Sequence, residues 1–424
     1  MKISPFPKYF LVSSFVILIS YCSTLAAITT DGKSNRFRGQ DGSGIYSSPN
    51  LPVAWGVDDY LWSIELPGDG HSSPMVWKDH LYLTSTDAGN PGSLLLCIDP
   101  ASGKEIWRLS FEAADRRLNK FNTFSSATTA VDEHHVYVAW SDSKHFQIAA
   151  VDHNGKGVWQ RDLGVHNTQH GGGISPVVFK DTVLIANDSR SPSAIHALDR
   201  MTGGDHWKID RPWDAKGKTS YSTPLLYQTP WGEALMIFNS TSSGMTAIKP
   251  ETGETAWQIE DLFPKRTIMS PIQVGEYIFA SCGDGNAGHF IAAIRPPKNK
   301  GEQATIAYKI RKSAPYVPTP VSNGNRLFLV SDGGIATCID APTGEEIWKG
   351  NLRDTFFSSP IRIDDRIYAV SRRANVVVFK ATDTFEILGR SLINEKTNAT
   401  PIVSNGRLYL RTVSHLYCLD GSDS

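Results

Sequence analysis

Short apolar segments alternate with polar turns along most of the chain, and the segments have the composition of β-strands. Leu81-Tyr82-Leu83, Val136-Tyr137-Val138 and Leu327-Phe328-Leu329 combine aliphatic and aromatic side chains. Such residues favour strands over helices, because branched and aromatic side chains pack well on a pleated surface. No amphipathic helical window of useful length interrupts this pattern. The sequence therefore predicts an all-β protein.

One unit recurs eight times. It begins with Ser/Thr-Pro or an equivalent pair, continues into a strand, and passes through a polar hairpin turn such as Asn323-Gly324 or Asn405-Gly406 into a second strand. The unit starts are 53, 49, 48, 47, 49, 40 and 41 residues apart. This is the period of a four-stranded blade, so the chain is predicted to form an eight-bladed β-propeller. The starts are Ser73-Pro74, Ser126-Ala127, Ser175-Pro176, Thr223-Pro224, Ser270-Pro271, Thr319-Pro320, Ser359-Pro360 and Thr400-Pro401.

The second half of each unit has a more regular signature. A third strand ends at Asp, a turn contains Gly, and Trp follows four residues after that Gly, as in Asp99…Gly103…Trp107. Asp and Gly suit the turn, and the indole is expected to cover the seam to the next blade. Tyr308 and Ile387 are expected to replace Trp in units five and seven. The tryptophans assigned to this structural repeat are Trp62, Trp107, Trp159, Trp207, Trp257 and Trp348.

The eighth unit ends at Leu419-Asp420-Gly421, before any Trp. The missing strand is found at the other end of the propeller, where residues 61–66 read Leu-Trp-Ser-Ile-Glu-Leu, like the segment that begins at Trp107. We therefore expect residues 59–66 to form the outer strand of the last blade and to close the ring. Closure leaves only short, protected sheet edges.

The N-terminus has the layout of a secretory signal peptide. Lys2 and Lys8 precede an apolar stretch from Phe10 to Ser20, and small residues allow cleavage after Ala26. The apolar stretch is short for a bilayer span, although an uncleaved anchor is the alternative. Acylation of Cys22 would make a lipoprotein, but the bulky Tyr21 before it fits that reading poorly. The expected organisation is a signal peptide at 1–26, an N-terminal extension at 27–57 and the propeller at 58–424.

The net charge and the distribution of charged and apolar residues limit the classes of partner that are expected. The formal charge of −1 becomes −3 when residues 1–26 are removed, and no cluster of basic residues suggests nucleic acid or a membrane surface. After signal cleavage no segment is long and apolar enough to span a membrane. We expect an exported monomer, periplasmic or extracellular.

The cysteines follow the blade register. Cys97, Cys338 and Cys418 each lie two positions before the Asp that ends the third strand, where other blades have Ala. Equivalent positions in different blades are too far apart for a disulfide, so these thiols are interpreted as small core side chains. Cys282 stands outside this register. The chain has no Cys-x-x-Cys-His motif for a covalent haem.

The Asp-x-x-x-Gly-x-x-x-Trp repeat resembles that of the pyrroloquinoline-quinone-like propellers. This family contains quinoprotein dehydrogenases and cofactor-free relatives, among them the propeller lipoprotein of the outer-membrane barrel assembly machinery. The segment Phe37-Arg38-Gly39-Gln40-Asp41-Gly42-Ser43-Gly44, followed by Leu51-Pro52 and Trp55, looks like the start of a group of secreted bacterial propellers of this class. The repeat match covers residues 58–420, and it implies the fold more specifically than the function.

Two classes of function remain open. Family dehydrogenases carry adjacent cysteines forming a ring disulfide, a Ca²⁺ site and a catalytic Asp, so the resemblance allows a quinone-dependent oxidoreductase acting on alcohols or sugars. This chain has no adjacent cysteines and lacks the insertions that lengthen those enzymes. Pyrroloquinoline quinone and calcium are therefore not expected, and a catalytic residue is not assigned. The favoured interpretation is a non-catalytic scaffold for a protein, peptide or saccharide ligand.

The loops that enter the first strands supply the candidate binding residues. Aromatic and arginine side chains at a rim are typical binding anchors, although such aromatics also fill the space between blades. Three histidines in these loops are potential ligands of a metal ion, but no carboxylate accompanies them, so metal binding is not expected. Asp284-Gly285-Asn286 lacks the rest of a calcium loop and is interpreted as a turn. The candidates are His71, Phe121, Asn122, His166, His170, Tyr221, Arg266, Tyr316 and Phe356.

Overall fold

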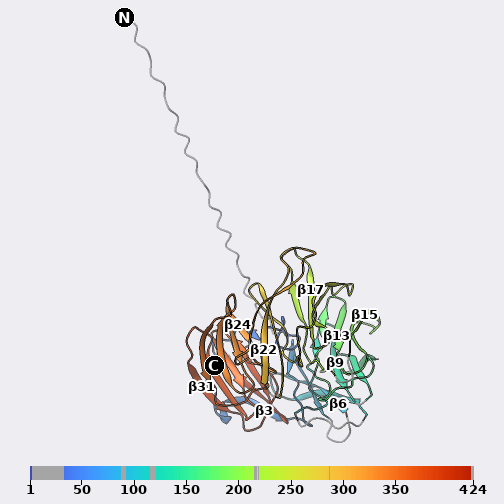
Figure 1. Ribbon diagram of the computed structural model, residues 1–424. Helices are drawn as coiled ribbons and strands as arrows, with labels where there is room; N and C mark the ends of the chain where they lie inside the picture. Colours follow the sequence, from blue (N-terminus) through green and yellow to red (C-terminus); the bar gives the residue numbers. More distant parts are fainter. Residues whose placement is uncertain are drawn as a thin grey trace.

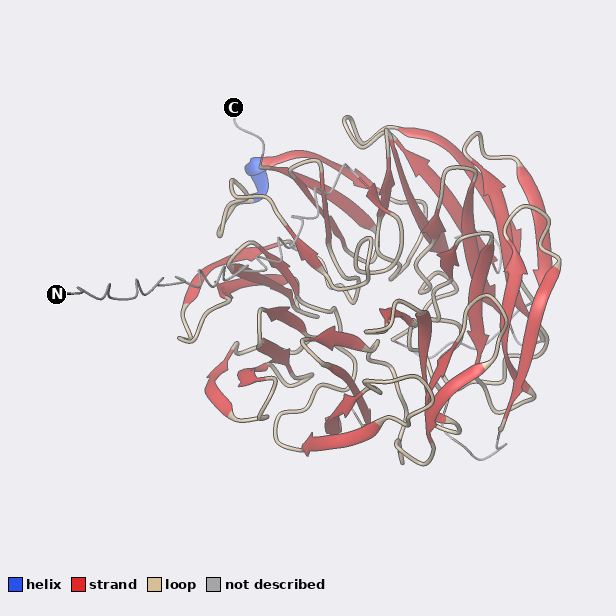
Figure 2. Ribbon diagram, turned by 90° about the horizontal axis from the view of Figure 1, so that it is seen from above, coloured by secondary structure: helices blue, strands red, loops and turns tan. Residues whose placement is uncertain are grey.

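Eight β-sheets are arranged in a ring (Figures 1 and 2), which confirms the predicted eight-bladed β-propeller. The structure is a computed structural model that describes residues 1, 33–86, 92–114, 121–142, 144–213, 217, 219–285 and 287–421. Residues 2–26 of the predicted signal peptide lie outside the described part. No helix among the described residues has the length and apolar character needed to cross a membrane.

Each blade contains four strands side by side, with the first strand next to the central channel and the last on the outside. The first four blades are β4 (Met75–Trp77), β5 (His80–Thr86), β6 (Gly92–Ile98) and β7 (Glu105–Glu112); β8 (Ala130–Val131), β9 (His135–Ser141), β10 (Phe146–Asp152) and β11 (Gly157–Asp162); β12 (Val177–Phe179), β13 (Thr182–Asn187), β14 (Ser193–Asp199) and β15 (Asp205–Arg211); and β16 (Leu225–Gln228), β17 (Ala234–Ser240), β18 (Gly244–Ile248) and β19 (Thr255–Ile259).

The other four blades follow the same order, except that the outer strand of blade 8 comes from the N-terminal side. They are β20 (Ile272–Val274), β21 (Tyr277–Asp284), β22 (Ala287–Arg295) and β23 (Thr305–Ile310); β24 (Val321–Asn323), β25 (Arg326–Val330), β26 (Ile335–Asp340) and β27 (Glu346–Asn351); β28 (Ile361–Ile363), β29 (Arg366–Val370), β30 (Asn375–Lys380) and β31 (Ile387–Leu392); and β32 (Ile402–Ser404), β33 (Arg407–Arg411), β34 (His415–Asp420) and β3 (Tyr60–Glu65).

The closure of the ring is confirmed. Strand β3 pairs antiparallel with β34, and Trp62 faces Cys418 across the pair. The short helix η1 (Val57–Asp59), which leads into β3, lies beside the C-terminal end of the described chain (Figure 2). Hydrogen bonds between the two ends of the chain therefore complete the last sheet.

Five of the six repeat tryptophans donate hydrogen bonds across the seams between blades, whereas the indole nitrogen of Trp257 is buried without a hydrogen-bond partner. The indole of Trp107 donates a hydrogen bond of 3.0 Å to the carbonyl oxygen of His153 in blade 2, and a Cβ on Gly155 would lie 2.7 Å from its ring. Gly155 has a φ of +85°, so glycine is required there for both conformation and space. The same donation occurs from Trp62 to Pro100, Trp159 to Arg200, Trp207 to Pro250 and Trp348 to Thr382.

Two further register predictions are confirmed. Tyr308 replaces Trp in blade 5, where it faces Ala293 and donates a hydrogen bond to the carbonyl of Ala341. Cys97 and Cys338 face Trp107 and Trp348 across their strands, as Ala does in blades 2 to 5. A small residue is needed at this position because the bulky ring of the neighbouring strand lies beside it.

Blade 7 departs from the prediction. Ile387 faces Phe379, and the residue in the tryptophan register is Gly389, which faces Val378. A Cβ on Gly389 would lie 2.2 Å from the carbonyl oxygen of Val53 in the N-terminal segment. Trp55 from that segment stacks on Tyr368 of blade 7, with ring centroids 6.5 Å apart.

The N-terminal segment thus supplies the aromatic side chain that blade 7 lacks in its tryptophan register. The amide of Trp55 donates to Ser391 Oγ in β31, and its indole donates to the hydroxyl of Tyr60 in the closing strand. Leu51 packs against Gly421 at the end of blade 8. Residues 51–55 therefore fill the seam between blades 7 and 8, a role that the repeat pattern alone did not predict.

Candidate functional site

A chain of hydroxyl groups links the inner ends of the blades. The backbone amide of Thr319 donates to Ser359 Oγ at 3.0 Å, and that of Ser359 donates to Thr400 Oγ1 at 3.0 Å. The Ser/Thr that begins each unit is thus a joint between neighbouring blades. The same bond runs from Ser73 to Thr128, Thr128 to Ser175, Thr223 to Ser270, and Ser270 to Thr319.

The series of hydrogen bonds to these hydroxyls shows that the predicted start of blade 2 was wrong. The hydroxyl in register is that of Thr128, and Ser126 lies two residues earlier in the entering loop, where its hydroxyl donates to Asn122 Oδ1. The prediction was wrong because Thr128-Thr129 lacks the proline that marks most other starts, and Ser126-Ala127 gave the better-looking match.

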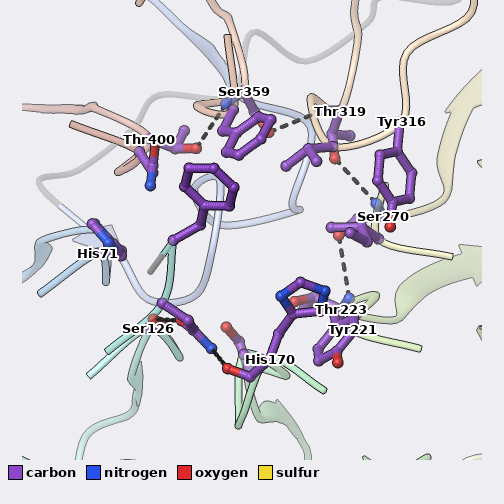
Figure 3. A pocket seen from close by; sticks show the side chains of 18 of the residues that line it. His71, Ser126, His170, Tyr221, Thr223, Ser270, Tyr316, Thr319, Ser359 and Thr400 are labelled. Atoms are coloured by element: carbon purple, nitrogen blue, oxygen red, sulfur yellow. Dashed lines mark hydrogen bonds between the residues drawn. The ribbon is translucent and has the colours of Figure 1, made fainter. Parts of the chain in front are cut away.

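A cavity of about 370 Å³ lies at the centre of the ring, on the side where chains enter the first strands (Figure 3). All eight blades contribute to its wall. The wall contains the hydroxyls of Thr223, Ser270, Thr319, Ser359 and Thr400, together with larger side chains from the loops above them. A single contiguous surface is therefore assembled from loops that are far apart in the sequence.

The N-terminal segment closes the cavity from below. Strand β1 (Lys33–Ser34) pairs antiparallel with β4, and β2 (Ile45–Tyr46) pairs parallel with β28. Between these strands Phe37 lines the cavity. The channel is therefore a funnel that is open on the loop face and has Phe37 in its floor.

Arg38 holds this plug in place. Its side chain is fully buried, and its guanidinium donates to the carbonyl oxygens of Thr319, Pro320 and Pro360 in blades 6 and 7, at 3.1, 2.6 and 2.9 Å. Burial lowers the pKa of Arg38 to about 10, so it remains cationic at neutral pH. Gly44 packs directly on it, since a Cβ there would lie 2.6 Å from Nη2.

Aromatic and arginine side chains form one wall. Arg266 is 6% exposed, and its guanidinium donates to the hydroxyl of Tyr316 and to Gln169 Oε1, both at 2.8 Å. Its Nε is buried and makes no hydrogen bond. Tyr221 lies beside His170 with ring centroids 6.1 Å apart, in an edge-to-face arrangement.

The opposite wall carries a second aromatic pair. Phe121 and Phe357 meet edge to face with centroids 5.8 Å apart. The guanidinium carbon of Arg372 lies 4.6 Å from the Phe121 centroid and 4.1 Å from that of Phe357. Such cation–π contacts hold the rings and the charge together at the mouth of the funnel.

Seven of the nine predicted candidates line this cavity. They are His71, Phe121, Asn122, His170, Tyr221, Arg266 and Tyr316. His166 and Phe356 do not line it, and their predicted place at the binding face is wrong.

His166 is buried, packs on Phe146 at 4.8 Å and hydrogen bonds Asn187 Oδ1 through Nδ1. Phe356 is fully buried in the core, and its neighbour Phe357 faces the cavity instead. Two adjacent phenylalanines in an irregular loop give no periodicity from which the inward ring could be chosen.

Sequence reasoning missed the floor of the funnel. The segment around Phe37 and Arg38 was noted as a family feature, but an arginine beside glycines does not indicate burial on its own. Gln169 was also missed, although it lies in the same loop as His170. Its role depends on Arg266, a partner from another blade, so no local signal identified it.

The funnel is electropositive. Burial, together with Arg411, Lys396 and Arg372, lowers the pKa of His71 to about 4. Burial, together with Arg266 and Arg190, lowers the pKa of His170 to about 4. Both histidines are neutral at pH 7, and the charged neighbours that shift them are all cations.

The carboxyl group of Asp332 lies behind the wall. Asp332 accepts hydrogen bonds from the backbone amides of Tyr316 and Val317, at 2.7 and 3.3 Å, and so fixes the loop that carries Tyr316. Burial raises the pKa of Asp332 to about 7 despite these bonds. Its oxygens are engaged with the backbone and are not among the groups that line the cavity.

The donor set of the cavity does not suit a calcium-dependent quinone. Among the described lining residues there is no Asp or Glu, and Ca²⁺ requires six or more oxygen ligands, including carboxylates. The described part of the chain holds no group of three His, Cys, Asp or Glu close enough to share a metal. Asp284, noted in the sequence, instead pairs with Lys265 and His289 at 2.9 and 2.8 Å.

Comparison with known proteins identifies the family. The profile of the family described as outer membrane protein assembly factor BamB matches residues 91–307 and 302–386. BamB from Yersinia pestis is 21% identical over 361 residues, which cover 84% of this chain and 73% of that protein.

Solved structures share the fold. The crystal structure of BamB from Moraxella catarrhalis has a TM-score of 0.60 at 16% identity and covers 85% of this chain and 97% of its own. A europium-containing methanol dehydrogenase has a TM-score of 0.68 at 11% identity, with 92% and 98% covered. Quinohemoprotein alcohol dehydrogenase from Comamonas testosteroni has 0.66 at 14%, with 94% and 82% covered. Because the family profile spans well over half of the sequence, this chain belongs to the BamB family of pyrroloquinoline-quinone-like β-propellers.

Proposed function

We propose that this protein is an exported, non-catalytic propeller, periplasmic or extracellular, that serves as an interaction scaffold. Its funnel holds a segment of a protein partner or another ligand at the centre of the loop face. The observation that carries this proposal is the assembly of one aromatic, hydroxyl-lined cavity from all eight blades, closed below by Phe37. Concave sites of this size with aromatic walls and a few fixed polar groups are typical of ligand binding.

The family relationship supports the same class of function. BamB proteins are described as assembly factors, and scaffolding of a partner is consistent with a rigid ring. The cavity wall also lacks the groups expected of a catalyst. Its described residues include no Asp, Glu, Lys or Cys, and its two histidines have no carboxylate among the lining residues to orient them.

A quinone-dependent oxidoreductase is the alternative. It is supported by the shared fold of the two dehydrogenases, which shows the architecture alone. The donor set described above does not fit the calcium that such a cofactor would need.

Partner retention tests the scaffold proposal. The purified protein, immobilised, should retain a partner from an extract of its own cells, and Tyr221→Ala should reduce the retained amount several-fold because it removes a wall of the funnel. Met201→Ala is the matched control, since Met201 is 44% exposed at a turn between β14 and β15 and does not line the cavity. Equal retention by both variants would contradict the assignment of the funnel as the binding site.

A further inference from the structure

We propose that the funnel receives an acidic segment of a protein partner, in which a carboxylate stands beside an apolar or aromatic side chain. This inference rests on the proposed function and specifies the chemistry of the ligand. The carboxylate would face the arginines of the funnel, and the apolar side chain would contact the aromatic floor and walls.

The charge of the funnel carries the first part of the argument. Arg266 lines the cavity, and Arg372, which is not itself a lining residue, lies over the lining pair Phe121 and Phe357. The Nε atoms of both arginines are buried without a hydrogen-bond partner. Buried cationic donors that lack a partner are costly, and an anion that reaches them would offset that cost.

The described lining residues offer no negative charge to neutralise these cations. Asp332, behind the wall, interacts with the charge of Arg372, but its oxygens accept hydrogen bonds from two backbone amides. Glu395 is engaged by the hydroxyls of Thr412 and Ser414, and Asp284 by Lys265 and His289. Burial is the main cause of the lowered pKa values of His71 and His170, and the charged neighbours that add to it are all cations.

Most polar side chains of the cavity already make hydrogen bonds within the protein, and this favours a ligand with an apolar body over a saccharide. Both ends of the Asn122 amide are used, by the carbonyl of His170 and by the hydroxyl of Ser126. Gln169 Oε1 is bound to Arg266, and most of the inner hydroxyls accept hydrogen bonds from neighbouring blades. A saccharide needs many free hydrogen-bonding groups, whereas Phe37, Tyr221 and Phe357 offer an apolar surface.

The size of the cavity fits this chemistry. About 370 Å³ accommodates a few side chains and not a folded domain. A partner would therefore insert a short exposed segment, while the rest of it contacts the surrounding loops. Arginine and aromatic residues at the centre of an interface commonly carry most of the binding energy.

Two immobilised hexapeptide pools test the inference with the full protein in solution. One pool has a fixed Phe-Glu core with randomised flanks, and the other has Phe-Gln in its place. We expect the Phe-Glu pool to retain about tenfold more protein, the effect of one hydrogen bond to a charged group. Arg372→Gln should reduce that ratio towards one, and Arg161→Gln, on the outer strand β11, should leave it unchanged.

The outcomes separate this inference from the proposed function. Equal retention by the two pools, with loss of both in Tyr221→Ala, would overturn the acidic preference and leave the scaffold intact. Retention by neither pool would overturn the inference, and the partner-retention experiment would then decide the scaffold separately. Binding of the protein to immobilised polygalacturonate, without retention on either peptide pool, would show that the anionic ligand is a glycan and would also overturn it.

Discussion

Trp62 faces Cys418 across the two outermost strands of blade 8, and its indole donates a 3.2 Å hydrogen bond to the carbonyl oxygen of Pro100 in blade 1. One side chain near the start of the propeller thus contacts both the last and the first blade. Strand β3 belongs to the sheet of the last blade and leads directly into the first, so it is the clasp that joins the two ends of the ring.

Removal of the clasp should destabilise the whole ring. Deleting residues 58–66 leaves β34 as an unpaired edge and exposes the seam between blades 8 and 1. We expect a large fall in the melting temperature, measured by circular dichroism against the full chain. Melting within a degree or two of the full chain would contradict the assignment of β3 as the clasp.

A matched pair of glycines tests the seam contact itself. Gly103 and Gly232 both have positive φ, +74° and +87°, so alanine is strained at either position. A Cβ on Gly103 would also lie 2.8 Å from the Trp62 ring, whereas one on Gly232 meets nothing within 4 Å. We expect Gly103→Ala to lower the free energy of unfolding by about 1–3 kcal/mol more than Gly232→Ala, by denaturant titration. Equal losses would show that the indole does not pack on the turn.

The buried arginine of the plug should be structurally important. Arg38→Met leaves the carbonyl oxygens of Thr319, Pro320 and Pro360 without their donor in the channel. We expect a loss of about 2–4 kcal/mol in the free energy of unfolding, since unpaired buried polar groups are costly. Arg161→Gln is the control because Arg161 lies at the outer edge of blade 2 and is partly exposed. A loss for Arg38→Met no greater than that of the control would refute the anchoring role.

The lowered pKa of His71 should make stability depend on pH. Above about pH 6.5 the imidazole is neutral in both the folded and the unfolded chain, so its contribution does not vary. Between pH 6.5 and 4 the unfolded chain takes up the proton first, and the folded state loses on the order of 2 kcal/mol as the pH falls.

Asp332 acts in the opposite direction over the same range, because its raised pKa lets the folded state hold a proton that the unfolded state has released. The measurement is therefore the difference in unfolding free energy between the native chain and His71→Gln at several pH values. The native chain should lose its advantage, or become the less stable of the two, towards pH 4. A difference independent of pH would contradict a buried neutral imidazole.

The fold could be predicted from the sequence because its determinants are local and repeated. The Gly…Trp spacing, the Asn-Gly turns and the Trp62 segment each specify a contact between adjacent strands or neighbouring blades, and eight copies reinforce one another. Errors arose where a copy was irregular. Thr128 lacks a following proline, and Gly389 stands where a tryptophan was sought because Trp55 fills that space from another part of the chain.

The site was less predictable than the fold. Loop position identified seven lining residues, because loops that enter equivalent strands must converge at the channel. The loop sequence could not separate Phe356 from Phe357, since no periodicity operates there. The plug formed by Phe37 and Arg38 could not be predicted because the partners of Arg38 are backbone carbonyls of distant blades. Every residue has such a carbonyl, so the sequence does not show which ones accept the hydrogen bonds.

Calorimetric titration of the purified protein with pyrroloquinoline quinone and Ca²⁺ tests whether the funnel is a binding site without redox chemistry. We expect no saturable heat, and no dye reduction when an alcohol or sugar is added. One-to-one binding, with dye reduction that depends on the added alcohol or sugar, would contradict it and establish a dehydrogenase.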